Sequence, residues 1–311
     1  MIKKRHILIV MGVLLIAFII GSIFDYQIAQ GIFQKDHWFS LLMSSFGVYP
    51  CYAGLAFISG GILSTSSQRK DLHIAIRILC YILSAAGYAF SVYLCGRELP
   101  SVNGYNVPHL ALVSYGICAV LFAGVFIASF FLCKKGDAKL LWRVLMVMTA
   151  IWVMSLLPAG FVIKLIIHRP RYRYLVRTGA VGFHNWWDNC KNYKDLIEEY
   201  KDGIEGFPIT KEDFKSFPSG HAGTGMVMAM ILPYLGFFFK KLKGKETLMF
   251  YIGITWGVIM MFSRMLSGAH YFTDVCAGAL IVMMVYFVVN FIVEKKGWLF
   301  IEEKPIEQPQ E

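Results

Sequence analysis

The chain has 311 residues, of which 57% are hydrophobic and only 16% are charged, and its mean hydropathy is +0.57. Soluble domains typically carry about 25% charged residues, so this composition excludes an ordinary soluble protein and indicates that lipid surrounds most of the chain. The net charge of +10 does not indicate nucleic-acid binding, because the basic residues lie in short clusters between apolar segments.

Eight apolar segments have, or nearly have, the length of about 20 residues that a helix needs to cross a bilayer. Pro50 and Gly60-Gly61 interrupt the second segment, and residues 37–46 before it fit a short interfacial helix. We therefore predict an all-α, polytopic transmembrane helical bundle of about eight spans. The predicted spans are 7–25, 47–65, 74–95, 109–133, 141–168, 219–239, 247–267 and 272–294.

The distribution of basic residues predicts the orientation of the bundle. Lysine and arginine are enriched in cytoplasmic loops, and here the N-terminus and every second connection are basic. Both termini are therefore expected in the cytoplasm, with residues 172–218 and the turn near 264–271 on the extracytoplasmic side. The seven basic residues within 172–218 oppose this orientation. The basic N-terminus and the several short basic connections favour it, and we give them more weight than this single loop.

The first segment follows Lys3-Lys4-Arg5, as in a signal peptide, but no convincing small-x-small cleavage site follows it. We expect an uncleaved span. The seven cysteines are scattered and have no paired metal-ligand spacing, so neither a disulfide framework nor a zinc site is predicted.

A first group of polar residues follows the fifth apolar segment. Lys164 and Arg171 are nearly two helical turns apart, so on a continuous helix both would project from one face. Pro170 is expected to end the helix just before Arg171. A lysine this deep in an apolar segment needs a charged partner, although Lys164 alone could instead extend to the membrane interface.

A second group, Pro218-Ser219-Gly220-His221, begins the sixth segment. Proline and serine suit a helix start, whose free N–H groups and positive dipole favour a phosphate. Gly220 would let the backbone approach that phosphate, and His221 could donate a proton to a leaving oxygen. Taken alone, the tetrapeptide equally fits a helix cap with an incidental histidine.

The third group spans the seventh and eighth segments. Arg264 ends one segment, and His270 begins the next. Asp274 follows His270 by four residues, so the two side chains are expected to meet on one helix face. The carboxylate would fix the imidazole tautomer and leave the other nitrogen free to attack, whereas a purely structural hydrogen bond is the alternative.

The predicted topology places the three groups on one side of the membrane, so we expect them to form one pocket. Three cations and a helix N-terminus would neutralise a phosphoryl group. One histidine would act as nucleophile, and the other as acid and then base. Since the sequence has no P-loop, no H-E-x-x-H helix and no acidic cluster for two divalent ions, no metal or other cofactor is predicted.

The three groups resemble the signature of the type 2 phosphatidic-acid phosphatase superfamily, which includes bacterial acid phosphatases and vanadium haloperoxidases. That signature is a lysine, an arginine-proline pair after six residues, then P-S-G-H, then S-R with a histidine and an aspartate downstream. The second and third groups match fully, but Tyr172 replaces the first proline. Arg169-Pro170 supplies such a pair two residues early, so Arg171 is the favoured phosphate ligand and Arg169 the alternative.

The resemblance implies that His270 becomes phosphohistidine, that Asp274 orients it, and that His221 protonates the leaving group. The implied phosphate ligands are Lys164, Arg171, Ser219, Gly220 and Arg264. A six-helix phosphatase core is also implied. We assign residues 1–140 to N-terminal transmembrane helices, 141–296 to the catalytic core with its extracytoplasmic loop, and 297–311 to a disordered cytoplasmic tail.

The implied function is metal-independent hydrolysis of a lipid phosphate or polyprenyl pyrophosphate at the extracytoplasmic face, with membrane lipid as the surroundings. Phosphatidic acid, phosphatidylglycerol phosphate and undecaprenyl pyrophosphate all fit, and a bacterial cell membrane is the expected location. A lipid phosphotransferase with the same intermediate, a glucose-6-phosphatase-like enzyme, and a non-enzymatic transporter or scaffold are the alternatives.

Overall fold

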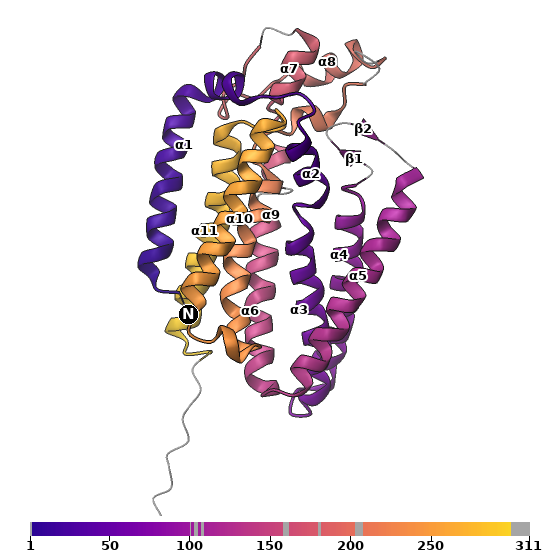
Figure 1. Cartoon of the computed structure of the whole chain (residues 1–311), viewed down its shortest axis with the longest axis vertical. Coiled ribbons are helices and arrows are strands. Elements are labelled where there is room, and N and C mark those ends of the chain that lie inside the picture. The colour runs from indigo at the N-terminus through magenta and orange to yellow at the C-terminus, as the bar shows by residue number, and fades with distance from the viewer. Residues whose placement is uncertain are drawn as a thin grey trace, which may run out of the picture.

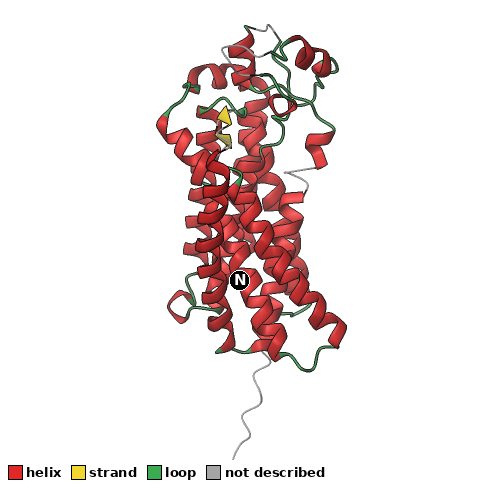
Figure 2. Ribbon diagram, turned by 90° about the vertical axis from the view of Figure 1, so that its right-hand side faces the viewer, coloured by secondary structure: helices red, strands yellow, loops and turns green. Residues whose placement is uncertain are grey.

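The structure, a computed structural model, describes residues 2–99, 101–102, 105–106, 109–157, 162–179, 182–202 and 208–299. These residues form helices and loops, apart from one antiparallel pair of two-residue strands, β1 (Ser101–Val102) and β2 (Tyr105–Asn106). Long helices run side by side, and most of the short elements, including α7 (Tyr172–Thr178), α8 (Tyr193–Glu199), β1 and β2, gather at one end of them (Figures 1 and 2). The predicted all-α polytopic bundle is confirmed.

Within the described residues, seven helical segments are long and apolar enough to cross a membrane. They are α1 (Lys4–Ile32), α2 with α3 (Trp38–Phe46 and Tyr49–Gln68), α4 (Ile74–Gly96), α5 (His109–Lys134), α6 (Ala138–Leu157), α10 (Glu246–Leu266) and α11 (Phe272–Lys295). The predicted span 219–239 is shorter as an α-helix: α9 (Gly220–Ile231) passes into the 3-10 helix η4 (Leu232–Phe237). Pro233 accounts for the change, since proline disrupts α-helical hydrogen bonding.

The single helix predicted over residues 141–168 is wrong. Helix α6 ends at Leu157, and the next described helix is the one-turn 3-10 helix η2 (Ile163–Leu165), followed by irregular chain up to residue 171. The sequence places Pro158 and Gly160 between α6 and η2, and both residue types disfavour a helix. Lys164 and Arg171 therefore do not share a helix.

The second predicted span is not interrupted. Pro50 lies in the first turn of α3, where proline is tolerated, and α2 before it is the predicted short helix. A Cβ atom on Gly60 would lie 2.1 Å from the carbonyl oxygen of Phe126, so this glycine allows α5 to pack directly against α3.

The described residues between 172 and 218 form a compact unit at one end of the bundle, which we call the cap. It contains α7 (Tyr172–Thr178), α8 (Tyr193–Glu199) and the 3-10 helix η3 (Lys211–Phe214). Its own buried cluster comprises Tyr174, Leu175, Cys190, Ile209 and Phe214. The remaining short element is the 3-10 helix η5 (Lys240–Leu242), which follows η4.

Helix α9 lies inside the bundle and packs against α6, α10 and α11, while α3 packs against α4, α5 and α6. A Cβ atom on Gly253 would lie 2.3 Å from the backbone of Ala229, which explains how closely α10 approaches α9. Helix α1 stands at the side of the bundle and packs mainly on α11 (Figure 1).

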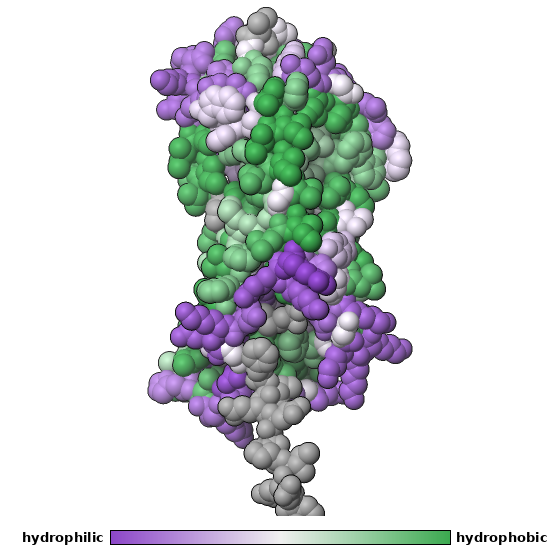
Figure 3. Space-filling view, turned by 90° about the vertical axis from the view of Figure 1, so that its left-hand side faces the viewer, coloured by the Kyte–Doolittle hydropathy of each residue, from purple (hydrophilic) through white to green (hydrophobic). Residues whose placement is uncertain are grey.

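The surface has the distribution expected of a membrane protein: a broad hydrophobic band lies between hydrophilic ends (Figure 3). The N-terminus and the end of α11 lie together at the end opposite the cap, where Lys4 Nζ is 2.9 Å from Glu294 Oε2 (Figure 1). The predicted tail 297–311 lies, from residue 300 onward, outside the described residues.

Candidate active site

The three predicted groups of residues converge beneath the cap on a cavity of about 1210 Å³. Six of the eight predicted site residues line this cavity: Lys164, Arg171, Gly220, His221, Arg264 and His270. Ser219 and Asp274 are completely buried and do not line it. Further charged side chains at the same end of the cavity are Arg97, Glu98, Arg173, Arg177, Glu212 and Asp213.

Two separate elements bring Lys164 and Arg171 to the cavity. Lys164 lies on η2, and Arg171 is the N-cap of α7, where its backbone N–H donates to the carbonyl oxygen of Asp213 at 2.8 Å. Burial and then the charge of Arg171 lower the pKa of Lys164 from 10.5 to about 7. A bound anion would favour the protonated lysine, since opposite charges stabilise each other.

Several guanidinium nitrogens at this end of the cavity are buried without a hydrogen-bond partner, although Arg173 Nε lies 3.9 Å from Asp213 Oδ1 in an ion pair. Among the described residues, the Nε atoms of Arg171, Arg173 and Arg264 and the Nη1 atom of Arg173 have no hydrogen-bond partner. Burial and then the charge of Arg171 lower the pKa of Arg173 well below 12.5. Buried donors without acceptors are costly, so this arrangement suits an anionic ligand.

Arg169 has a different environment from Arg171. It is completely buried, and it donates from Nη1 to Asp274 Oδ1 at 2.6 Å and from Nη2 to Asp25 Oδ2 at 2.8 Å. Its Nε donates to the carbonyl oxygen of His184 at 2.8 Å. Protein partners therefore occupy its guanidinium group, and the geometry favours Arg171 over Arg169 as a phosphate ligand.

The start of α9 is organised by Ser219. Its Oγ accepts from the backbone N–H of Ala222 at 3.3 Å, and its own N–H donates to the carbonyl oxygen of Asp274 at 2.9 Å. The hydroxyl group thus caps the helix instead of reaching the cavity. Gly220, the first residue of α9, is the member of this group whose backbone faces the cavity.

His221, in the first turn of α9, is close to a carboxylate that the sequence analysis did not single out. Its Nε2 lies 3.3 Å from Oε2 of Glu98, which follows α4. Burial alone would raise the pKa of Glu98, but His221 and then Arg97 and Arg264 hold that pKa below its usual value. Burial and then the charge of Arg264 lower the pKa of His221, and the ionised carboxylate of Glu98 opposes this shift by favouring the protonated imidazole.

His270 precedes α11 instead of beginning it. Tyr271 is the N-cap of α11, and Asp274 Oδ2 accepts from its backbone N–H at 2.8 Å in a capping box. The two side chains do come together, as predicted, but not on one helix face, because His270 precedes the helix. The Nδ1 atom of His270 lies 3.9 Å from Asp274 Oδ2 but only 2.6 Å from the carbonyl oxygen of Ser216.

This hydrogen bond determines the tautomer of His270. A carbonyl oxygen can only accept, so Nδ1 carries the proton and Nε2 keeps its lone pair. Burial, followed by the charges of Arg171, Lys164 and Arg264, lowers the pKa of His270 well below 6.5. The imidazole is therefore neutral at neutral pH, as a nucleophile requires.

Three residues near the site were not predicted: Arg173, Glu98 and Asp25. Arg173 lines the cavity and follows Arg171 by two residues, but it belongs to none of the three predicted groups. Asp25 had a detectable signal, because it is an acidic residue at the end of an apolar span. Glu98 had none, since it lies in a short polar connection far from the motifs in the chain.

Beyond its charged end, the cavity continues as an apolar extension between α3, α4 and α6. The extension is lined by Val48, Tyr52, Leu55, Ile58 and Ile62 before and along α3, by Leu83, Ala86, Phe90 and Leu94 of α4, and by Met146, Trp152, Val153, Leu156 and Leu157 of α6. The helical rise from residue 48 to residue 62 corresponds to about 21 Å.

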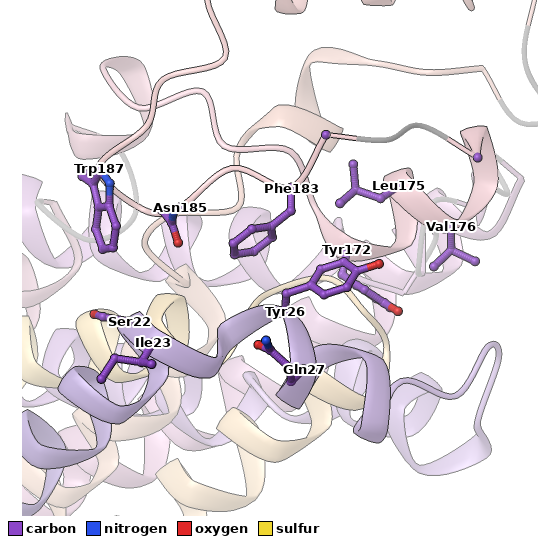
Figure 4. A pocket seen from close by; sticks show the side chains of 12 residues that line it. Ser22, Ile23, Tyr26, Gln27, Tyr172, Leu175, Val176, Phe183, Asn185 and Trp187 are labelled. Atoms are coloured by element: carbon purple, nitrogen blue, oxygen red, sulfur yellow. The ribbon is translucent and has the colours of Figure 1, made fainter.

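A second cavity, of about 770 Å³, lies between α1 and the cap. Tyr26 and Gln27 of α1 face Tyr172 and Phe183 of the cap across it (Figure 4). Its described lining contains no charged side chain and none of the predicted site residues. It therefore lacks the groups that a phosphate site requires.

In the part of the chain that the structure describes, no group of three or more histidine, cysteine, aspartate or glutamate residues could hold a metal ion. Lysine and arginine side chains supply positive charge at the charged end of the cavity.

A membrane-embedded helical bundle with a cationic cavity around two histidines is the class of protein that these observations define. Residues 139–298, just over half of the chain, match the family model of the PAP2 superfamily, and the chain belongs to that superfamily. This membership indicates phosphatase activity in general. No curated protein and no solved structure matches the chain significantly. The matched segment starts in α6, so helices α1 to α5 lie outside it.

Proposed function

We propose that this protein removes phosphate from a lipid phosphate or polyprenyl pyrophosphate through a covalent phosphohistidine at His270. One observation carries the proposal: a single cavity has cations and two histidines at one end and an apolar extension at the other. A charged headgroup and a hydrocarbon chain require these two environments side by side.

The phosphate would bind among Lys164, Arg171 and Arg264, with Arg173 as a further cation. The N–H groups at the start of α9, where Gly220 lines the cavity, add hydrogen-bond donors and the positive end of a helix dipole. Phosphoryl transfer depends mainly on positioning and on neutralising the charge of the equatorial oxygens. These side chains supply that charge without a metal ion.

The reaction would proceed in two displacements. The Nε2 lone pair of His270 attacks phosphorus, the bond from phosphorus to the leaving oxygen breaks, and His221 donates its proton to that oxygen. His221 then takes a proton from water, the hydroxide attacks phosphorus, and the phosphorus–nitrogen bond breaks to release phosphate. Glu98 would favour protonated His221, and Asp274 would stabilise positive charge on His270 from 3.9 Å.

The apolar extension favours a lipid substrate over a small soluble one. A glucose-6-phosphatase-like enzyme would leave this part of the cavity without a role. A lipid phosphotransferase would use the same intermediate, because only the acceptor of the second step differs. We further propose that the cap end faces the extracytoplasmic side, since the basic connections lie toward the other end.

A substrate panel on the purified protein in detergent micelles tests the proposal. Phosphatidic acid, phosphatidylglycerol phosphate and undecaprenyl pyrophosphate are compared with glucose 6-phosphate and p-nitrophenyl phosphate, and released phosphate is measured. At least one lipid should be turned over much faster than both soluble compounds. A preference for glucose 6-phosphate would contradict a lipid substrate, and absence of release from every compound would support a non-enzymatic role. Phosphate recovered on an added alcohol would identify a transferase.

A further inference from the structure

Asp25 of α1 forms a buried polar contact with the start of α11. Its side chain is 2% exposed, and Oδ1 accepts from the backbone N–H of Thr273 at 2.9 Å. The Thr273 hydroxyl donates to Oδ2 of the same carboxylate. Helix α1 departs from helical geometry at Phe24, immediately before this aspartate. Asp25 therefore lies where α1 bends, against the helix that follows His270.

The second partner of Asp25 is Arg169, which joins it to Asp274. Arg169 Nη2 donates to Asp25 at 2.8 Å, and Nη1 donates to Asp274 Oδ1 at 2.6 Å. The guanidinium carbon also lies 4.0 Å from the ring centroid of Tyr271. The position of Arg169 is thus fixed by two carboxylates and an aromatic ring, and one of those carboxylates comes from α1.

The contacts continue from Asp274 to His270. Asp274 Oδ2 accepts from the Ser216 hydroxyl at 2.5 Å, and the carbonyl oxygen of Ser216 accepts from His270 Nδ1 at 2.6 Å. Asp25, Arg169, Asp274, Ser216 and His270 therefore form one continuous chain of contacts. Four of these residues lie within the matched segment 139–298, and Asp25 alone does not.

We propose that Asp25 is a positioning residue for the phosphatase reaction: it fixes Arg169, and through Arg169 it holds Asp274, Ser216 and the imidazole of His270 in their reactive arrangement. The inference rests on the proposed function, in which His270 is the nucleophile. A buried charge at the end of a membrane helix is expensive, and apolar contacts would attach α1 to the bundle at lower cost. Linking the charge to the histidine through Arg169, Asp274 and Ser216 gives it a purpose that packing does not.

Contacts between the residues just after α1 and the turn that carries His270 support this role. The backbone N–H of Gln34 donates to the carbonyl oxygen of Leu266 at 2.9 Å. A Cβ atom on Gly268, which has a φ of +61°, would lie 2.7 Å from the ring of Phe33. The residues just after α1 thus contact the turn between α10 and α11 on one side, and Asp25 secures the start of α11 on the other.

The test compares steady-state kinetics of the wild type with those of Asp25→Asn on whichever compound of the panel is turned over. Since a small displacement of reacting groups can cost about 100-fold in rate, we expect kcat to fall about 10- to 100-fold. KM and inhibition by inorganic phosphate should change little, because Asp25 does not line the cavity. Ser22→Ala is the matched control, because Ser22 lies on the same helix as Asp25. This variant removes the 3.0 Å hydrogen bond that Trp186 of the cap donates to the Ser22 hydroxyl, and it should keep the wild-type kcat.

A double-mutant comparison separates positioning from general damage. If Asp25 acts through Arg169, Arg169→Gln and the double variant Asp25→Asn/Arg169→Gln should have the same kcat. If the kcat of the double variant falls by the product of the two single losses, the proposal is overturned. An unchanged kcat in Asp25→Asn would also overturn it, as would a loss of phosphate binding as large as the loss of kcat. If Asp25→Asn fails to fold, Thr273→Val removes a hydroxyl from the same network and should lower kcat alone, whereas an unchanged kcat there also overturns it. A wild type without phosphate release would instead refute the proposed function.

Discussion

The Nδ1 atom of His270 donates a hydrogen bond to the carbonyl oxygen of Ser216 at 2.6 Å, while the carboxylate of Asp274 lies at 3.9 Å. A backbone carbonyl therefore sets the tautomer, and the carboxylate acts from a longer distance. Because Asp274 also accepts from the Ser216 hydroxyl, it controls the position of the group that holds the imidazole. The Nε2 lone pair is left free for the attack on phosphorus that we propose.

His270→Ala should abolish phosphate release, with a loss on the order of 1000-fold or more, because the covalent intermediate cannot form. Radiolabelled substrate should transiently label the wild type but not this variant. His168→Ala is the control, because His168 stacks on Tyr193 at 4.1 Å in the cap and does not line the cavity. Turnover at the wild-type rate in His270→Ala would remove the basis for the mechanism.

The pKa of about 7 for Lys164 predicts a decrease in kcat/KM at basic pH. The pKa is lowered, so the lysine is cationic below about pH 7 and becomes neutral as the pH rises, which weakens phosphate binding in the free enzyme. Lys164→Arg keeps the charge at high pH and should move this basic limb upward by more than one pH unit. A basic limb that is identical in the two proteins would show that another group titrates.

The sequence was sufficient to predict the bundle from its apolar segments, and the convergence of its motifs from the alternation of basic connections along the chain. Apolar length marks the spans, and short polar motifs at their ends mark the lining of the cavity. Lys164, His221 and Arg264 reach the cavity as expected, although η2 and the start of α7 replace the predicted helix around the first of them.

The contacts that could not be predicted are between residues far apart in the chain. Glu98 contacts His221, 123 positions later in the chain, and Asp25 contacts Arg169, 144 positions later. No local pattern encodes such pairs, which depend on how α1 and α4 pack around the matched segment. The partner of His270 was missed for a related reason, since a carbonyl group belongs to every residue and leaves no signature in the sequence.

Phosphate release should continue in the presence of excess EDTA. The charged end of the cavity neutralises phosphate with lysine and arginine side chains, and nothing in the proposed displacements requires a divalent ion. Initial rates of phosphate release before and after extensive dialysis against EDTA should agree within about twofold. Loss of activity that magnesium restores would require a different mechanism.

Ala86→Trp should selectively impair long-chain substrates. Ala86 lines the apolar extension on α4, so an indole ring there would occupy space proposed for the hydrocarbon chain. We expect kcat/KM for a long-chain lipid phosphate to fall about tenfold or more, as extra bulk in an apolar pocket does, with less effect on p-nitrophenyl phosphate. Ala85→Trp, at the neighbouring exposed position outside the cavity lining, is the control. Equal losses with both substrates would contradict a chain-binding role.

The orientation of the bundle can be tested with single introduced cysteines, because all seven native cysteines are buried. Lys191→Cys places an exposed thiol in the cap, and Lys243→Cys places one beyond η5 in a basic connection. With the cap outside, a membrane-impermeant maleimide applied to intact cells should label Lys191→Cys and not Lys243→Cys, because basic connections favour the cytoplasm. Permeabilising the cells should then expose Lys243→Cys, which confirms that its thiol is reactive. Labelling of Lys243→Cys alone in intact cells would invert the proposed topology and place the cavity on the cytoplasmic side.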